Sequence, residues 1–238
     1  MEAMILAAGL GTRLRPLTND RPKALVEVNG ITLLEYNIRR LIGFGFNRIV
    51  INVHHFPDMI IDFVKSRKFD AEILFSDERE QLMDTGGALK KAAPLFSGKE
   101  PVLIHNVDIL STLDLGEIYR KHLETKALAT LLVSKRDTAR QLLFDDSGEL
   151  VGWENLLTGE VLLNRSIEKA PDNMAFSGIH IVNPELFKLL PEAAPYPIIP
   201  EYLKIAKDHK TLAFKHLAED WLDVGKPETL KMAEKIIK

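Results

Sequence analysis

The sequence predicts an α/β fold of three layers, in which helices cover both faces of a mixed, mainly parallel sheet. Segments of helical period separate short apolar runs, and this alternation favours parallel strands joined by right-handed crossovers. From about Arg140, two turn signals between extended stretches predict a small antiparallel ribbon. The apolar runs, rich in Val, Ile and Leu as buried strands are, cover residues 3–7, 48–53, 72–75, 102–105 and 127–133.

Local signals place the helices between these strands. The segment TLLEYNIRRLIGFG begins with Thr32 and Glu35 at the spacing of a capping box and ends near two glycines. The segment PDMIIDFVKSR carries its proline at the start, where a helix tolerates it. After a last strand, AFSGIHIV, we expect at least two short helices and a closing helix over residues 227–238.

Length, charge and composition limit the kinds of protein. A chain of 238 residues with 46% hydrophobic residues is long enough for a substantial core, which predicts one domain over residues 1–238. The formal charge of -3, without a basic patch, argues against nucleic acid as the partner. With no cysteine, disulfides and thiolate chemistry are excluded. The start AMILAAGL lacks the basic region of a signal peptide and no spanning segment follows, so we expect a cytoplasmic protein without membrane contact.

The stretch LAAGLGTRLRP, directly after the first predicted strand, has features of a phosphate-binding loop. Ala7 and Ala8 leave room beside the backbone for a planar ring. Gly9 and Gly11 let backbone N–H groups approach phosphate oxygens. A solvated loop after a strand is the alternative interpretation.

Two common phosphate-loop motifs do not fit this stretch. The dinucleotide fingerprint requires a third glycine where Leu14 stands, and the Gly-Lys pairs of the chain are not followed by the Ser or Thr of a Walker motif. Arg13 and Lys23 nevertheless supply the cations that a polyphosphate requires. The loop therefore predicts phosphate binding of another kind.

Two aspartates are candidates for the metal that a triphosphate normally requires. Mg²⁺ prefers a few carboxylates and keeps several waters. Asp108 follows the apolar run PVLIHNV, which places it at the carboxyl end of a predicted central strand. Asp223, in WLDVG, precedes a glycine turn and the closing helix. Ordinary turn positions are the alternative for both residues.

The stretch LAAGLGTRLRPLTNDRPKALVEVNG resembles the signature of the sugar-1-phosphate nucleotidyltransferases. The resemblance continues in the family's order through DTGGALKKAAPLF, NVDIL, FSGIHIV and WLDVGKPETL, so it covers essentially the whole chain. It implies the Rossmann-like nucleotide-diphospho-sugar transferase fold, with a nucleotide-binding half over residues 1–110. The sugar-binding half, residues 111–238, contains the antiparallel ribbon and the closing helices.

The resemblance also implies residue roles. Arg13, Lys23 and Asp108 are the expected catalytic residues, and Asp108 and Asp223 the expected ligands of Mg²⁺; Val107 stands where many relatives have glycine. The adjacent glycines of DTGGAL are expected against the nucleobase, with close packing as the alternative. The expected nucleotide-binding residues are Leu6, Ala7, Ala8, Gly9, Gly11, Thr12, Arg13, Gly86, Gly87 and Asn106.

The reaction implied is transfer of a nucleotidyl group from a nucleoside triphosphate (NTP) to a sugar 1-phosphate, with release of pyrophosphate. A sugar phosphate is already an anionic nucleophile, so neither a protein nucleophile nor a strong base is required. Arg13, Lys23 and Mg²⁺ suit the alignment and charge compensation that remain. A non-catalytic regulatory relative is a second hypothesis. We expect such a relative to have lost at least one charged residue of the site, but all four are present: Arg13, Lys23, Asp108 and Asp223. A dinucleotide-dependent oxidoreductase is disfavoured by Leu14.

Within the family, DTGGALKKAAPLF and FSGIHIV are more similar to the uridylyltransferases of N-acetylmuramate 1-phosphate, which act in cell-wall recycling, than to the thymidylyltransferases. UTP is therefore the favoured triphosphate. GTP with mannose or heptose 1-phosphate, and glucose 1-phosphate with UTP or dTTP, are alternatives. Gln81 or backbone groups suit uracil, whereas a carboxylate such as Glu78, Glu80 or Asp84 suits guanine.

The later half supplies the expected sugar-binding residues. Arg140 and Gln141 are placed to meet the carboxylate of a muramyl lactyl group. The Glu-Lys-Ala stretch at residues 168–170 only partly matches the Glu-Lys-Pro of many relatives. Trp153 could line the cleft or simply pack. The expected set is Arg140, Gln141, Asn155, Glu168, Ser177 and Gly178. We expect a monomer or small homo-oligomer.

Overall fold

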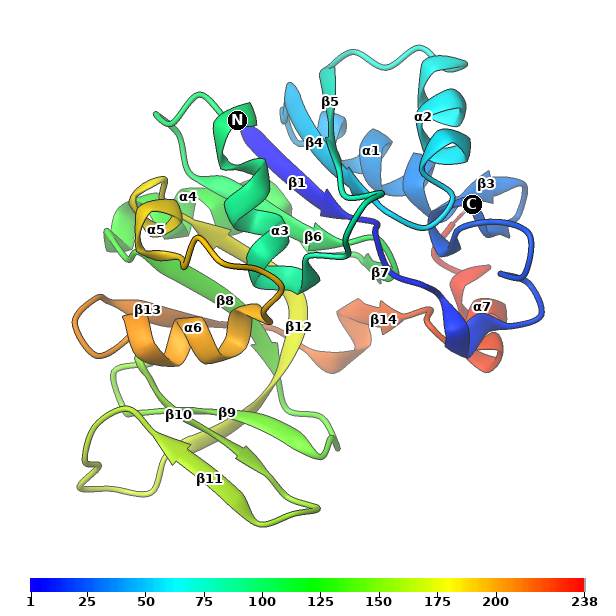
Figure 1. The fold of residues 1–238 in the computed structure, drawn as a ribbon. Coiled ribbons are helices and arrows are strands. Elements are labelled where there is room, and N and C mark those ends of the chain that lie inside the picture. The colour runs from blue at the N-terminus through cyan, green and yellow to red at the C-terminus, as the bar shows by residue number, and fades with distance from the viewer. Residues whose placement is uncertain (238) are drawn as a thin grey trace.

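The computed structural model describes residues 1–237, and its main sheet contains ten strands. Eight of them lie in the order β11-β10-β9-β12-β6-β1-β4-β5, and β8 and β13 continue from β12 (Figure 1). The four strands at one side of this sheet are mutually parallel, so their carboxyl ends meet at one edge. They are β1 (Glu2–Leu6), β4 (Arg48–Val53), β5 (Glu72–Asp77) and β6 (Val102–Asn106).

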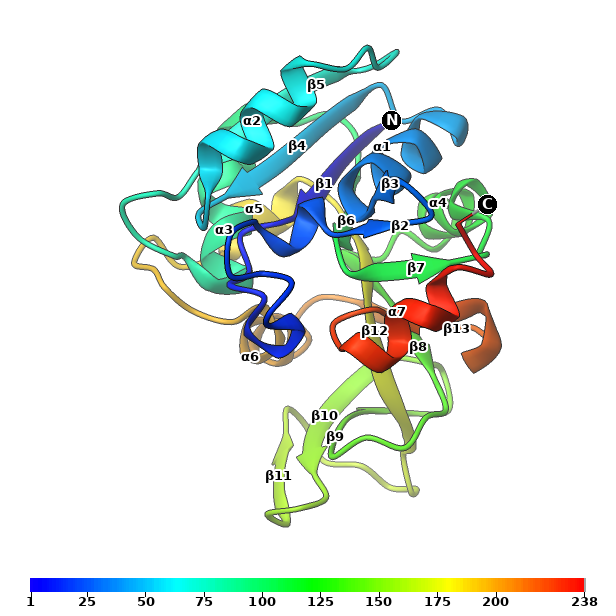
Figure 2. The same ribbon diagram turned by 90° about the vertical axis from the view of Figure 1, so that its right-hand side faces the viewer.

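Helices cover both faces of the sheet, which confirms the predicted layers. In the view of Figure 2, α3, α5 and α6 lie to the left of β1 and β6, and α1 and α4 to the right. Alternate side chains of β1 enter the two cores, Ala3 and Ile5 on one side and Met4 on the other. Burial on both faces explains why these strands are continuous apolar runs. The helices are α1 (Leu33–Gly43), α2 (Pro57–Lys65), α3 (Asp84–Ala92), α4 (Leu115–Thr125), α5 (Glu185–Leu189), α6 (Ile198–Ile205) and α7 (Pro227–Ala233).

The predicted helix starts are confirmed, but the closing helix is shorter than predicted. The Thr32 hydroxyl oxygen accepts a hydrogen bond of 3.1 Å from the Glu35 N–H, which caps α1. Helix α7 ends at Ala233, and the chain turns so that Ile237 is buried. The Asn29 side chain stabilises this turn by donating to the Ile237 carbonyl at 2.8 Å. Residue 238 lies outside the described residues.

The predicted ribbon is present and is built on one long strand, β12 (Asp172–Val182). The carboxyl half of β12 pairs with β6, and its amino half pairs with β9. The ribbon therefore extends downward from the rest of the sheet in Figure 1. Between these halves the register shifts at Gly178, whose φ of 71° favours glycine. The ribbon strands are β9 (Arg140–Phe144), β10 (Leu150–Asn155) and β11 (Glu160–Leu163).

Of the remaining strands, β8 (Ala129–Ser134) was predicted by the apolar run at residues 127–133, and the others were not predicted. The pairing of β7 with β14 aligns Ile109 with Asp223, which brings the neighbourhood of Asp108 to the last strand. Within residues 1–237, no helix is long and apolar enough to cross a membrane. The additional strands are β2 (Glu27–Val28), β3 (Ile31–Thr32), β7 (Ile109–Ser111), β8 (Ala129–Ser134), β13 (Thr211–Lys215) and β14 (Trp221–Asp223).

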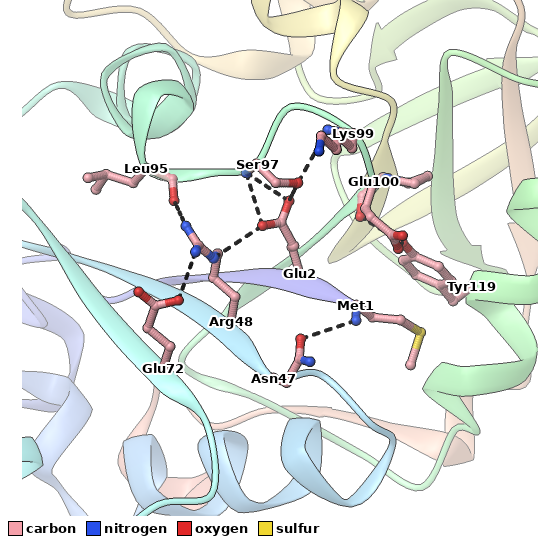
Figure 3. Close-up of polar contacts among 11 residues, drawn as sticks. Met1, Glu2, Asn47, Arg48, Glu72, Leu95, Ser97, Lys99, Glu100 and Tyr119 are labelled. Atoms are coloured by element: carbon pink, nitrogen blue, oxygen red, sulfur yellow. Dashed lines mark hydrogen bonds and ion pairs between the residues drawn. The ribbon is translucent and has the colours of Figure 1, made fainter.

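The amino ends of the parallel strands are closed by a polar network (Figure 3). The buried Glu2 carboxylate accepts hydrogen bonds from the Ser97 N–H at 3.0 Å and the Ser97 hydroxyl at 2.9 Å. Arg48 lies 3.4 Å from Glu2, 2.8 Å from Glu72 and 3.1 Å from the Leu95 carbonyl oxygen. The charged groups at this end therefore pair with one another.

Candidate active site

The glycine loop leaves β1 at the opposite end of the sheet and carries two cations to one place. Gly11 adopts a left-handed conformation with φ of 64°, and its carbonyl accepts a hydrogen bond of 2.8 Å from the Thr18 hydroxyl. Arg13 follows in a short helical turn, and Lys23 begins the next one. A Cβ on Gly11 would lie 3.1 Å from the Lys23 Cβ, so the two turns pack closely.

Four charged side chains meet beside this loop, as the sequence predicted for this set. Lys23 Nζ donates to Asp108 Oδ2 at 2.7 Å. The Arg13 guanidinium lies 3.9 Å from Asp108 Oδ2 and 3.8 Å from Asp223 Oδ2, so it bridges the two carboxylates. The Lys23 side chain is only 14% exposed, whereas Arg13 is 55% exposed. The set therefore has an inner ion pair and an outer, solvent-facing one.

Backbone contacts hold Asp108 in this position. The Val107 carbonyl accepts a hydrogen bond of 2.9 Å from the buried Asn37 side chain of α1. The Val224 N–H donates to the Asp108 carbonyl at 2.9 Å, which fixes β14 beside it. A Cβ on Gly225 would lie 2.5 Å from Arg13 Nη2, so a larger residue there would require the guanidinium to shift. The positions of the two aspartates thus depend on α1, on the residue that follows β14 and on the space left by Gly225.

A cleft of about 500 Å³ opens on the inner side of these charges. Six of the predicted residues line it: Leu6, Ala8, Gly9, Lys23, Asn106 and Asp108. Ala7 lies behind the lining and donates its N–H to Asn52 Oδ1 at 2.7 Å. Gly11, Thr12 and Arg13 lie on the turn beyond the residues that line the cleft.

The adjacent glycines of α3 pack against the segment before α6, and neither is among the lining residues of this cleft. The N–H groups of Gly86 and Gly87 donate to the Tyr196 carbonyl at 2.9 and 3.2 Å. A Cβ on Gly86 would lie 2.5 Å from the Tyr196 ring, and one on Gly87 2.7 Å from the Ala194 Cβ. This is the close packing that the sequence left open; Thr85 lines the cleft in their place.

Glu78 joins two walls of the cleft from a fully buried position. One of its carboxylate oxygens accepts from Asn52 Nδ2 at 2.8 Å and the other from the Met83 N–H at 3.1 Å. Burial raises the pKa of Glu78, and these two hydrogen bonds oppose that rise. Its backbone carbonyl also contacts His54 Nδ1 at 2.7 Å. Glu78 also lines the cleft, and the two hydrogen bonds of its carboxylate hold it between Asn52 and Met83.

A second cleft, of about 640 Å³, lies between the ribbon, β12, α6 and β14. Five of the six predicted sugar-binding residues line it: Arg140, Gln141, Asn155, Ser177 and Gly178. Glu168 does not, because the connection from β11 to β12 carries it to a separate hollow with Asp145 and Asp146. There its neighbour Lys169 forms an ion pair of 2.6 Å with Asp146. The structure therefore separates Glu168 from the rest of the predicted set.

The ribbon presents two cross-strand rows to this second cleft. By strand register, Leu142, Trp153 and Leu162 form an apolar row, and all three line the cleft. Arg140, Asn155 and Glu160 form the adjacent polar row, which also lines it. Such a surface can pack the apolar face of a ligand and hydrogen-bond its substituents.

Sequence reasoning missed three residues of the site. Asn52 connects the glycine loop to Glu78, and its only signal is a polar side chain at the carboxyl end of a buried strand. Trp221 and Arg136 both line the second cleft, and the guanidinium carbon of Arg136 lies 3.7 Å from the centre of a Trp221 ring. The available signal for Trp221 was its position two residues before Asp223, because side chains at this spacing on a strand point to the same face.

Comparison with known proteins agrees with this geometry. A family model described as nucleotidyl transferase matches residues 2–144. The N-acetylmuramate alpha-1-phosphate uridylyltransferase of Caulobacter vibrioides is 34% identical over 98% of this chain and 95% of its own length. The mannose-1-phosphate guanyltransferase of Saccharomyces cerevisiae is 30% identical over 96% of the chain, which spans only 62% of that protein.

Solved structures show the same fold at lower identity. HddC from Yersinia pseudotuberculosis superposes with a TM-score of 0.78 at 22% identity, over 100% of this chain and 99% of that one. A UDP-glucose pyrophosphorylase complexed with UDP-glucose gives a TM-score of 0.75 at 20% identity, over 98% and 97%. The family model covers more than half of the chain, and the uridylyltransferase aligns along almost all of it. The chain therefore belongs to the nucleotidyl transferase family, as its resemblance to the sugar-1-phosphate nucleotidyltransferases predicted.

Proposed function

We propose that the protein transfers a nucleotidyl group from an NTP to a sugar 1-phosphate. The observation that carries this proposal is the position of the four charged residues where the two clefts adjoin. Asp108 and Lys23 line the first cleft, Asp223 lines the second, and Asn106 lines both. The nucleotide-binding half thus supplies one substrate site, and the sugar-binding half the other.

The reaction requires charge compensation more than acid–base chemistry. A phosphate oxygen of the sugar 1-phosphate attacks the α-phosphorus of the triphosphate, and the bond to the β-phosphate oxygen breaks as pyrophosphate leaves. No proton has to be removed from the nucleophile. Lys23 and Arg13 offset the repulsion between the two anions when these are brought together. Their fixed positions avoid reorganisation during the step.

The carboxylates fit a Mg²⁺ ion. Asp108 Oδ2 lies 3.9 Å from Arg13 Nη2 and Asp223 Oδ2 lies 3.8 Å from Arg13 Nη1, so both carboxylates face the same cation. Magnesium is commonly held by one or two carboxylates together with substrate phosphates and water, and this pair offers that donor set. When bound, the ion would polarise phosphate oxygens and help align the triphosphate. Asn37, Val224 and Gly225 keep the two aspartates in place.

The proposed substrates are N-acetylmuramate 1-phosphate and UTP, giving UDP-N-acetylmuramate. Support comes from 34% identity to the uridylyltransferase over nearly the full length of both chains. The apolar row suits the N-acetyl and lactyl substituents, and Arg140 and Gln141 line the cleft where a lactyl carboxylate would need a partner. Such an activity would act in cell-wall recycling in the cytoplasm. GTP with mannose 1-phosphate is the second candidate, because the guanyltransferases align over 96% of the chain.

The test is pyrophosphate release in a matrix of substrates. UTP, GTP, dTTP, ATP and CTP are each mixed with Mg²⁺ and the 1-phosphates of N-acetylmuramate, N-acetylglucosamine, glucose, mannose and heptose. We expect the fastest turnover with UTP and N-acetylmuramate 1-phosphate. A preference for GTP and mannose 1-phosphate would replace the substrates but keep the reaction. Absence of turnover in every combination would reject the catalytic proposal.

A further inference from the structure

Arg136 is a partly buried cation whose side chain is fixed at the edge of the second cleft. It follows β8, and its Nε donates to the Ser134 hydroxyl at 2.8 Å. Its Nη2 donates to the Phe176 carbonyl at 2.8 Å, and Trp221 covers one face of the guanidinium at 3.7 Å. These contacts orient the group and leave Nη1 without a hydrogen bond to any of residues 1–237. A free edge of a fixed guanidinium is a ready donor for an oxyanion.

The contact with Trp221 places Arg136 beside the carboxylates of the reacting centre. Trp221 and Asp223 are two residues apart on β14, so their side chains leave the same face of the strand. Both line the same cleft as Arg136. Burial lowers the pKa of Arg136, and the Asp223 charge raises it, which reflects their proximity. No carboxylate within residues 1–237 forms an ion pair with Arg136, so its charge is available to a ligand.

The sugar substrate brings a phosphate dianion that requires its own cation. The first cleft contains Lys23, which is already paired with Asp108 at 2.7 Å. The lining of the second cleft contains two cations, Arg136 and Arg140. Arg140 belongs to the polar row of the ribbon, whereas Arg136 contacts β14 two residues before Asp223. The neighbouring Lys135 is 76% exposed and lies 3.5 Å from Asp172.

We propose that Arg136 binds the 1-phosphate of the sugar substrate and aligns it with the reacting centre. The inference rests on the proposed transfer to a sugar 1-phosphate and does not depend on which sugar is used. The Nη1 edge donates to phosphate oxygens, while Trp221 and the Phe176 carbonyl hold the guanidinium in place. Arg136 is therefore a catalytic residue for every sugar 1-phosphate that the enzyme accepts. Arg140 contributes only to recognition of the sugar substituents.

The experiment compares Arg136→Gln and Arg136→Lys with Lys135→Gln, the exposed neighbouring cation outside the lining of the cleft, as the matched control that should keep wild-type KM values. Initial rates are measured with each substrate varied at saturating levels of the other. Loss of a charged hydrogen bond predicts a rise of about 10- to 100-fold in KM for the sugar 1-phosphate in Arg136→Gln. We expect a smaller rise in Arg136→Lys and an unchanged KM for the NTP. A merely structural role would instead move both KM values and the melting temperature together.

Binding calorimetry separates the two anions that Arg136 could meet. Affinities of wild type and Arg136→Gln are measured for N-acetylmuramate, N-acetylmuramate 1-phosphate and N-acetylglucosamine 1-phosphate. The proposal predicts loss of affinity for both 1-phosphates and none for the free sugar. Equal losses for N-acetylmuramate and its 1-phosphate would show that the lactyl carboxylate is the anion bound, which overturns the proposal. Unchanged affinity for all three would overturn it as well.

Two other outcomes, an Arg136 variant that does not fold and a wild-type protein without turnover, need separate interpretation. If Arg136→Gln does not fold, Arg136→Ala is assayed with added guanidinium ion, and recovery of the low KM supports the proposal while no recovery contradicts it. If wild-type protein turns over no sugar 1-phosphate, the proposed function fails before any variant is compared. If the enzyme is active and the Arg136 variants keep wild-type KM values, the Arg136 inference fails while the proposed function stands.

Discussion

The two ends of the parallel strands contain similar residue types but differ in how their charges are balanced. At the amino ends, Glu2 is buried and meets Arg48 and both donors of Ser97. At the carboxyl ends, Arg13 is 55% exposed and reaches its two carboxylates only at 3.9 and 3.8 Å. Two clefts open beside the second set, whereas in the first set Arg48 and Ser97 engage the Glu2 carboxylate (Figure 3).

This difference separates stability from function within one sheet. Hydrogen bonds completed inside the protein stabilise the fold and offer nothing to a ligand. The exposed Arg13 guanidinium, whose carboxylate partners lie 3.9 and 3.8 Å away on a backbone fixed by other elements, can still donate to a phosphate. Substitutions at the amino ends should therefore change unfolding, and substitutions at the carboxyl ends should change the rate.

The largest expected effect is at the carboxyl ends. Asp108→Asn removes the carboxylate that pairs with Lys23 and is the proposed metal ligand, so the rate of pyrophosphate release should fall by about 10²- to 10³-fold. The circular dichroism spectrum should stay that of the wild type. Asp146→Asn, which removes only the exposed pair with Lys169, is the matched control and should keep the full rate. A full rate in Asp108→Asn would remove Asp108 from the mechanism.

At the amino ends, Glu2→Ala should lower the free energy of unfolding by about 2–3 kcal/mol, because Arg48 and Ser97 lose buried, charge-assisted hydrogen bonds. Denaturant unfolding measures this loss, and kcat measured well below the melting temperature should stay unchanged. Glu72→Ala removes the 52% exposed partner of the same Arg48 and should cost less than about 1 kcal/mol. Equal losses in the two variants would contradict the assigned difference in burial.

Between the two ends, the sheet contains two buried histidines that should make stability sensitive to acid. Burial lowers the pKa of His105 to about 4 and that of His180 to about 3. Both stay neutral in the folded state while the unfolded chain takes up protons below its ordinary pKa of about 6.5, so stability is lost as pH falls below that value. From pH 7 to about pH 5, each should lower the free energy of unfolding by about 2 kcal/mol.

The variant His180→Leu tests this origin of the acid sensitivity. It should reduce the loss between pH 7 and about pH 5 by about 2 kcal/mol, whatever its effect on stability at pH 7. Denaturant unfolding at several pH values measures the slope. Glu78 acts in the opposite direction, because burial raises its pKa and the folded state gains protons first. An unchanged slope in His180→Leu would show that other groups cause the acid effect.

The smallest expected effect sharpens the geometry of the active site. In Gly225→Ala, the new Cβ would lie 2.5 Å from Arg13 Nη2 and 2.7 Å from Asp223 Oδ1, so both side chains must shift. The rate should fall by up to about tenfold, with little change in stability. Gly43→Ala, at the end of α1 with open space around it, should leave both unchanged. A normal rate in Gly225→Ala would show that the bridging position of Arg13 is not needed.

Local signals predicted much of the fold. Continuous apolar runs gave the four parallel strands within one or two residues of their bounds, because strands buried on both faces need no polar alternation. Thr32 and Glu35 predicted the start of α1, because the hydrogen bond between them joins residues only three positions apart in the sequence. The closing helix was overextended, because burial of Ile237 in the core ended α7 early.

The site could be predicted only in part. The glycine loop, Lys23, Asp108 and Asp223 stand in recognisable motifs, and the structure brings them together. Gly86 and Gly87 depend on the distant Tyr196, and the position of Glu168 depends on the turn of the ribbon at Asp145. Contacts of this kind join segments far apart in the chain, so no local pattern reports them.

The sequence by itself determined the layers, the glycine loop that we propose binds phosphate, and the identity of the charged residues, because these follow from local periodicity and motif. The tertiary structure decided which charges meet. Pairing of β7 with β14 carries Asp223 to Asp108, and the bend of β12 at Gly178 directs the ribbon toward the same cleft. It also placed Arg136 over Trp221, beside Asp223. Strand pairing and side-chain packing are properties of the whole chain, so these positions had to be read from the fold.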